Sequence, residues 1–261
     1  MAVQPLDTYI RAVRIELQSS GAAMRRLMPD YQESVRAEEL SNLAIGEIGT
    51  IIRALASGLD KLGNAAHVHA FGEEGIRTYF PLTTVEGQFS KLLRSNLRGI
   101  AEVKPNVAAA FERCQPFHPE FEILALLRPL YRTHAHRGFE LHEAIQSLTF
   151  EEIDENVTLQ EDSVDARSWP GVTVDRTYYT LLGVVSGDLR ATMRNDWHFA
   201  GTENSVMGTL LELHNVTVKV VGIILKSLEA PFSAVDLAKL SVRAVPAPAK
   251  PRSEAQTNGL L

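Results

Sequence analysis

Residues with the chemistry of an active site gather near the middle of the chain, between positions 128 and 137. The members of this Arg/His cluster are Arg128, Arg132, His134, His136 and Arg137. An imidazole can take or give a proton near neutral pH, and a guanidinium can hold a phosphate or a carboxylate. We therefore treat Arg128, Arg132, His134 and His136 as candidate catalytic residues and Arg137 as a candidate binding residue.

Helical geometry divides the cluster between two faces. At about 100° per residue, Arg128, Arg132 and His136 follow one another at four-residue steps on one face. His134 instead continues the apolar stripe that passes through Tyr131. The first three are the expected polar trio, and His134 is expected to be partly buried.

Three roles remain open for the cluster. The leading interpretation is structural, because Arg and His in a last helical turn interact favourably with the helix dipole, and Gly138 is well placed as a C-cap. The alternatives are a binding site for phosphate or an acidic partner, and a catalytic site.

Composition restricts the function classes. The 261 residues carry a net charge of −6, whereas a general nucleic-acid coat needs a basic surface. The longest apolar run, from Val216 to Leu225, is too short for a membrane span and contains Lys219, and the N-terminal residues lack a signal peptide's apolar stretch. Cys114 is the single cysteine, so no intramolecular disulfide can form. We expect a cytoplasmic protein without a membrane segment.

Apolar spacing predicts helices through the first half of the chain. Residues 6–17 form an amphipathic helix, and Pro29 is expected to end the region that follows. A longer helix has an apolar stripe made of Leu43, Ile48, Ile51, Ile52, Leu55, Leu59 and Leu62. A third helix covers 89–100, Pro105 begins a fourth, and Pro119 begins a fifth that carries the cluster. Residues 202–228 form the last helix.

A different pattern follows Gly138. Short apolar alternations predict a small antiparallel β insertion at about residues 139–200, within one helical domain that spans residues 1–230. Trp197 and Phe199 are expected to pack this insertion against the helices. Residues 231–261 are expected to form a flexible tail that is disordered from Val245 onward.

Metal and cofactor motifs are weak. The pairs His67-Val68-His69 and His134-Ala135-His136 lack a third ligand at a recognised spacing. The glycine-rich stretches at 72–75 and 183–187 lack the lysine or the strand-to-helix spacing of a nucleotide loop. We expect no metal and no cofactor.

An ordered series of motifs lies between residues 40 and 145. Its members are Ile51–Leu62, Tyr79-Phe80-Pro81 followed by Phe89, Cys114-Gln115-Pro116-Phe117, Leu124–Leu130 and His136-Arg137. This order resembles a group of uncharacterised bacterial helical proteins, in which the last helix ends in Asp-Lys-His-Arg. The present chain has His134-Ala135 where Asp-Lys would stand. The group's helices resemble those of the HEPN superfamily, so the resemblance implies a mainly α, HEPN-like helical bundle.

HEPN ribonucleases carry an arginine followed after four to six residues by a histidine, and five residues separate Arg128 from His134. The resemblance thus implies a metal-independent endoribonuclease, in which histidine moves protons at the ribose 2′-hydroxyl and the leaving oxygen while arginine stabilises phosphate charge. Pro129 stands where those enzymes tend to have a polar residue.

Two functions are therefore expected, in order of preference. The first is a non-enzymatic binding or assembly module with a protein partner or self-association, because the apolar stripes exceed the chemistry that can be identified. The second is a HEPN-like metal-independent endoribonuclease or RNA-binding protein that uses the Arg/His cluster.

Overall fold

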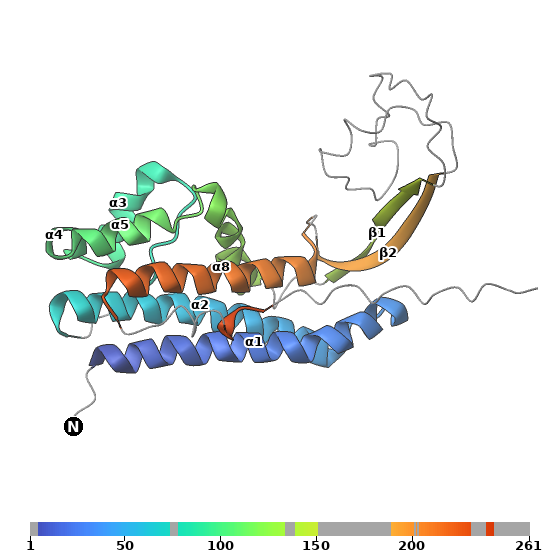
Figure 1. Cartoon of the computed structure of the whole chain (residues 1–261), viewed down its shortest axis with the longest axis horizontal. Coiled ribbons are helices and arrows are strands. Elements are labelled where there is room, and N and C mark those ends of the chain that lie inside the picture. Colours follow the sequence, from blue (N-terminus) through green and yellow to red (C-terminus); the bar gives the residue numbers. More distant parts are fainter. Residues whose placement is uncertain are drawn as a thin grey trace, which may run out of the picture.

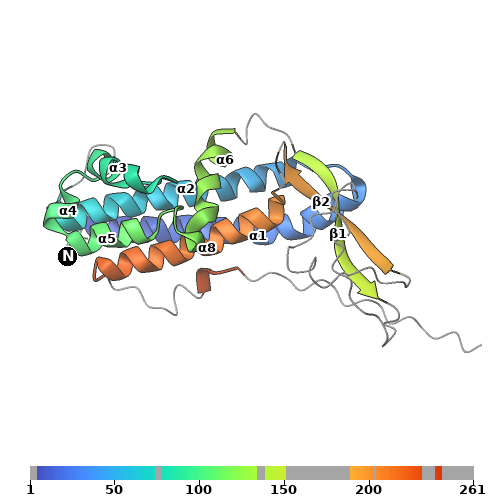
Figure 2. The same cartoon turned by 90° about the horizontal axis from the view of Figure 1, so that it is seen from above.

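The computed structural model describes residues 5–73, 78–133, 139–150, 189–200, 202, 204–230 and 239–242. This described part is mainly α-helical with a small antiparallel β ribbon, as the sequence predicts. Its body is formed by three long helices, α1 (Pro5–Ala37), α2 (Asn42–Phe71) and α8 (Val206–Ser227). Figures 1 and 2 show these helices running alongside one another.

Several short helices cover α2 and α8 on the side away from α1 (Figure 1). They are η1 (Glu86–Gln88), α3 (Phe89–Asn96), α4 (Ile100–Val103), α5 (Pro105–Arg113), η2 (Pro119–Leu126) and α6 (Leu127–Thr133). Pro105 begins α5 as predicted. The predicted third helix is interrupted after Asn96, where Gly99 adopts a positive φ of 80° that favours glycine.

The predicted fifth helix is α-helical only from Leu127, because the η2 segment before it is a 3-10 helix. Phe121, Leu124 and Leu127 are all buried. Their three-residue spacing matches the three residues per turn of a 3-10 helix, so this conformation places all three side chains in the core.

Pro29 does not end the first helix, contrary to the prediction. It lies exposed inside α1, which continues to Ala37 although an interior proline costs about 3 kcal/mol. Contacts beyond Pro29 oppose this cost: the Tyr31 hydroxyl donates a 2.5 Å hydrogen bond to Asp196 Oδ1, and Ser34 Oγ accepts one from Trp197 Nε1 at 3.1 Å. Tertiary contacts therefore extend the helix.

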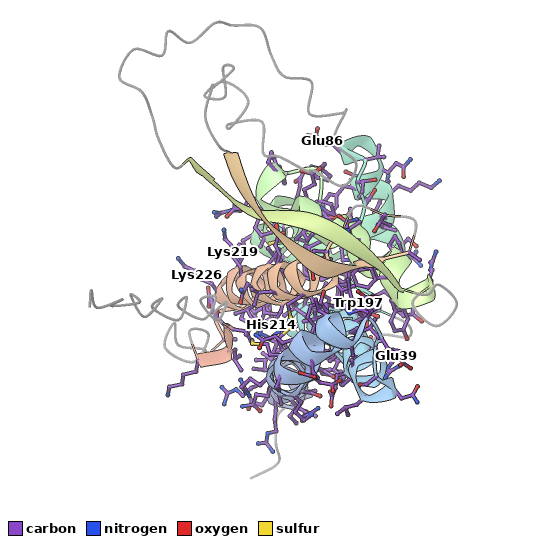
Figure 3. The ribbon with its side chains drawn as sticks, turned by 90° about the vertical axis from the view of Figure 1, so that its right-hand side faces the viewer. Glu39, Glu86, Trp197, His214, Lys219 and Lys226 are labelled. Atoms are coloured by element: carbon purple, nitrogen blue, oxygen red, sulfur yellow. The ribbon has the colours of Figure 1, made fainter. Side chains whose placement is uncertain are left out.

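The β ribbon pairs β1 (Phe139–Phe150) with β2 (Leu189–Phe199) and extends from one end of the helices (Figure 1). Trp197 and Phe199 are buried, as predicted, and Trp197 lies where the ribbon meets α1 (Figure 3). Asp196, which accepts from Tyr31, also accepts a 2.6 Å hydrogen bond from Ser205, the N-cap of α8. The base of the ribbon thus links α1 to α8.

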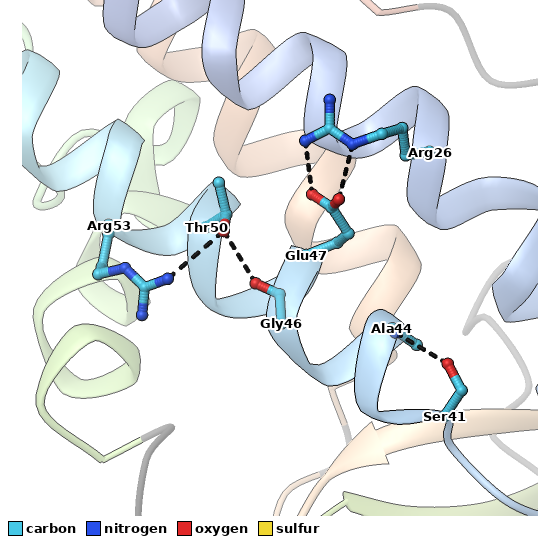
Figure 4. A network of polar contacts seen from close by, with 7 residues as sticks. All are labelled: Arg26, Ser41, Ala44, Gly46, Glu47, Thr50 and Arg53. Atoms are coloured by element: carbon cyan, nitrogen blue, oxygen red, sulfur yellow. Dashed lines mark hydrogen bonds and ion pairs between the residues drawn. The ribbon is translucent and has the colours of Figure 1, made fainter.

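The α2 stripe forms the centre of the core, with one exception. Leu55 is fully buried, whereas Leu43 is 59% exposed. Ile48 comes five positions after Leu43, which is about 140° around a helix, so Leu43 falls off the predicted stripe. A polar contact also joins α1 and α2: Arg26 donates two hydrogen bonds, of 2.6 and 2.8 Å, to the buried Glu47 carboxylate (Figure 4).

Four residues of the region predicted as a flexible tail, 239–242, dock against α1 and α8. Leu240 and Val242 are buried. The carbonyl of Leu240 accepts a 2.7 Å hydrogen bond from His214 Nε2, and the Asn215 amide pairs with both backbone groups of Val242 at 3.1 Å. The rest of the predicted tail, from Val245 onward, lies outside the described residues.

By length and composition, α8 is a candidate membrane span. In the folded chain, 56% of its most apolar window is buried. Its neighbours include α2, α5 and η2. Core helices of soluble proteins share this composition.

The buried stripe predicts a contrast between two leucines of α2. Leu55→Ala should lower the free energy of unfolding by about 2–5 kcal/mol, because a fully buried side chain leaves a cavity. Leu43→Ala, the control, should change it by less than about 0.5 kcal/mol. Urea denaturation measures both values, and equal losses would contradict the placement of the two side chains.

His214 predicts a pH dependence of stability. Burial, assisted by the charge of Arg25, lowers the pKa of His214 below its usual value, although the hydrogen bond to Leu240 opposes this. The unfolded chain therefore binds a proton that the folded chain excludes, and this contribution to stability is present above about pH 6.5 and lost as pH falls through the lowered pKa. Urea denaturation between about pH 5 and 8 should show His214→Gln losing part of that dependence. Identical profiles for the two chains would contradict it.

Candidate functional site

The two described arginines of the Arg/His cluster line one pocket. This pocket of about 500 Å³ lies between α2, residues 79–82, α3 and α6. Its volume falls within the range of about 300–1,000 Å³ that is usual for sites of small organic ligands. The walls mix leucines with polar and aromatic side chains.

A close backbone contact positions the pocket over α2. A Cβ atom on Gly63 would lie 3.2 Å from the carbonyl carbon of Tyr79 and 3.3 Å from the nitrogen of Phe80. Glycine is therefore the residue that lets this segment cross α2 so closely. Asp60 and Asn64 flank Gly63 on α2 and occur four residues apart, so both lie on the helix face beneath the segment.

Asp60 and Arg128 hold both backbone polar groups of Phe80. The Phe80 N–H donates to Asp60 Oδ1 at 3.1 Å, and the Arg128 guanidinium donates to the Phe80 carbonyl at 2.6 Å. Burial raises the pKa of Asp60, while the Phe80 N–H and the charge of Arg128 oppose that rise. These two contacts fix Asp60, Phe80 and Arg128 relative to one another, and we call these three residues the floor of the pocket.

Further hydrogen bonds hold the two ends of residues 78–83. The Thr78 hydroxyl donates to Asn64 Oδ1, and Asn64 Nδ2 donates to the Asp60 carbonyl at 3.1 Å. Gln115 Oε1 accepts a 3.0 Å hydrogen bond from the N–H of Thr83. Residues 78–83 are thus held from α2 at one end and from the turn after α5 at the other.

Arg132 differs from Arg128 in its surroundings. It follows Arg128 by one helical turn, lines the same pocket and is exposed. It makes no hydrogen bond or ion pair with any residue that the structure describes, whereas Arg128 is partly buried against Phe80. The structure therefore brings Arg128 and Arg132 together, as their spacing predicts. His134, His136, Arg137 and Gly138 lie outside the described residues.

Tyr131 does not lie on the buried stripe, contrary to the prediction. It is 50% exposed and lines the pocket together with Tyr79, which is 47% exposed. Helix α6 crosses α2 steeply (Figure 2), so an apolar stripe on α6 leaves the bundle within one turn after Leu127. The two tyrosines instead offer ring surface to a ligand.

Sequence reasoning missed Asp60, Asn64 and Tyr79 as site residues. The signal that could have found two of them was the ordered motif series, because Asp60 lies in Ile51–Leu62 and Tyr79 begins Tyr79-Phe80-Pro81. The motif Leu124–Leu130 brings Arg128 to the same place. Three of the five motifs therefore meet at this pocket.

The first His-x-His pair is not arranged to share a ligand. His67 and His69 lie in α2, where two residues are about 200° apart, rather than in the extended segment that a shared ligand requires. His67 stacks near Phe71, with ring centroids 4.7 Å apart. Among the described residues, no group of three or more His, Cys, Asp or Glu side chains could hold a metal ion.

The contacts at Phe80 predict what the loss of the Arg128 side chain does. In the original chain the charge of Arg128 favours the ionised form of Asp60, so Arg128→Gln should raise the pKa of Asp60 further. NMR titration of the Asp60 carboxyl carbon measures this pKa. The loss of a charged hydrogen bond to Phe80 should cost about 1.5–3 kcal/mol of stability. Arg53→Gln, at an exposed α2 arginine outside the pocket, is the control; equal effects in both variants would contradict the assignment.

Comparison with family models, with curated proteins and with solved structures finds no match for this chain. The chemistry of the site is therefore described by its own residues: a fixed polar floor at Asp60 and Arg128, and an exposed guanidinium at Arg132 beside two tyrosine rings.

Proposed function

We propose that this chain is a non-enzymatic binding module whose pocket takes a small organic anion. The observation that carries the proposal is the placement of Arg132, exposed at the pocket and without a described partner, beside Tyr79 and Tyr131. A planar guanidinium binds a carboxylate or phosphate through two parallel hydrogen bonds. The tyrosine rings and the leucine walls suit an apolar or aromatic body attached to that anionic group.

The other charged groups of the pocket support this choice of ligand. Lys61 is paired with Glu16, and Arg128 with the Phe80 carbonyl, so Arg132 is the cation best placed to meet a ligand. Asp60 accepts from the Phe80 N–H and is therefore engaged in holding the floor. Binding by a preformed site of this kind loses little conformational entropy.

Assembly with a protein partner or a second copy is a related proposal, since a partner's carboxylate has the same chemistry as the expected ligand. The HEPN-like likeness is also a proposal, and its support is the meeting of three ordered motifs at one pocket. Cytoplasmic location stays a prediction.

A second candidate function is a metal-independent endoribonuclease or RNA-binding protein. The observation that favours it is that Arg128 and Arg132 share a pocket and that the histidines of the cluster follow directly in the sequence. In this function His136 would move the proton, and Arg132 would stabilise charge on the phosphate.

The binding proposal predicts a charge-selective pocket. We expect 2-naphthoate to bind the purified chain and 2-naphthamide, which has the same shape without the charge, to bind more weakly. Arg132→Gln should raise the dissociation constant of 2-naphthoate about tenfold or more, because a charge-assisted hydrogen bond is lost. Titration followed by NMR measures these constants, and Arg94→Gln, at an exposed arginine of α3 outside the pocket, is the control.

Two outcomes would decide against this proposal. If both probes bind equally, or if Arg132→Gln binds 2-naphthoate as the original chain does, the anionic pocket is wrong. If RNA is cleaved in the presence of EDTA and His136→Ala abolishes the cleavage, the ribonuclease function replaces it.

A further inference from the structure

A second pocket lies between α1 and the docked residues 239–242. It has a volume of about 230 Å³, and its charged lining residues are Arg14, Arg25 and Lys239. No carboxylate among the described residues lines it. Such a concentration of positive charge contrasts with the net charge of −6 of the whole chain.

One face of α1 supplies most of this pocket. Arg14, Gln18, Gly21 and Arg25 follow one another at steps of four, three and four residues, which places them along one side of the helix. A Cβ atom on Gly21 would meet side chains of α8 and of the docked segment at 3.6 and 3.7 Å and the Arg25 guanidinium at 3.8 Å. Gly21 thus lies where α1, α8 and the docked segment meet, with Arg25 beside it.

The third cation reaches the pocket through the docked segment. The hydrogen bond from His214 to the Leu240 carbonyl and the pairing of Asn215 with Val242 fix this segment beside α1. His214 belongs to α8 and lies on the side of that helix that faces α1 (Figure 3), where it shares a 3.0 Å hydrogen bond with Ser20 of α1. Lys239 is thereby held close to cations that are far from it in sequence.

Arg25 and Lys239 are the two cations of this pocket that are open to a ligand. Neither makes a hydrogen bond or ion pair with another residue in the described ranges, and the positive charge of Arg25 acts as far as His214, whose protonation it disfavours. Two positive charges held close together repel each other, and an anion placed between them is attracted by both, which offsets this repulsion. The volume is below the roughly 300–1,000 Å³ of pockets for larger organic ligands, so a group of few atoms fits best.

We propose that this pocket is an oxyanion site that takes a phosphoryl group and fastens residues 239–242 to α1. A phosphoryl group carries nearly two negative charges and three acceptor oxygens, which matches several converging cations better than a single carboxylate does. The Gln18 amide and the Arg25 guanidinium supply directed donors, and Lys239 supplies a point charge. The group is either free phosphate or the phosphorylated end of a small metabolite.

The test uses the full chain with inorganic phosphate and glycerol 3-phosphate as separate probes. Calorimetric titration should show binding that weakens about tenfold or more in Arg25→Gln and in Lys239→Gln, because each loses a charged contact. Arg53→Gln and Arg94→Gln, at exposed arginines outside both pockets, should bind phosphate unchanged. Preference between the probes identifies the source of the phosphoryl group.

A second readout concerns the docked segment. Phosphate should slow amide hydrogen exchange at 239–242 in the original chain and not in Arg25→Gln, because a ligand that binds only the docked state stabilises it. Absence of phosphate binding, equal weakening in Arg53→Gln, or exchange at 239–242 that phosphate does not alter would each overturn the proposal.

Discussion

The crossing of α2 by the segment around Phe80 is the constraint on which the candidate site depends. Gly63 permits the close approach, since a Cβ atom there would lie only 3.2–3.3 Å from the Tyr79 and Phe80 backbone. Asp60 and Arg128 then hold the N–H and the carbonyl of Phe80. Because backbone groups buried without partners are costly, this double attachment makes the crossing stable as well as close. The attachment also ties α6 to α2, and α6 in turn presents Arg132 to the pocket.

Much of the helical architecture could be predicted from local sequence. The stripe around Leu55, the proline that begins α5 and the burial of Trp197 all follow from patterns within one element. Pro29 could not be placed correctly, because the contacts that keep α1 helical beyond it come from Asp196 and Trp197, far away in sequence. The 3-10 conformation of η2 was hidden for a related reason: a spacing of three is compatible with either helix type.

The candidate site was predictable only in part. A four-residue step places Arg128 and Arg132 on one helix face whatever the fold, so their shared face was predicted, whereas the pocket that this face lines was not. Whether Arg128 would meet a ligand or a backbone carbonyl depends on the path of the loop, which no local pattern describes. Likewise, the oxyanion pocket needs Lys239 beside α1, and that placement comes from the His214 and Asn215 contacts rather than from any motif.

Hydrogen exchange at the Phe80 amide, in the original chain and in Gly63→Ala, tests the central claim most directly. A methyl group at position 63 would press on the Tyr79 and Phe80 backbone. We predict a strongly protected Phe80 amide in the original chain, and a large loss of that protection in Gly63→Ala while amides around Leu55 stay protected. A Phe80 amide that exchanges as fast as an unstructured one in the original chain, or that is equally protected in both, would contradict the account.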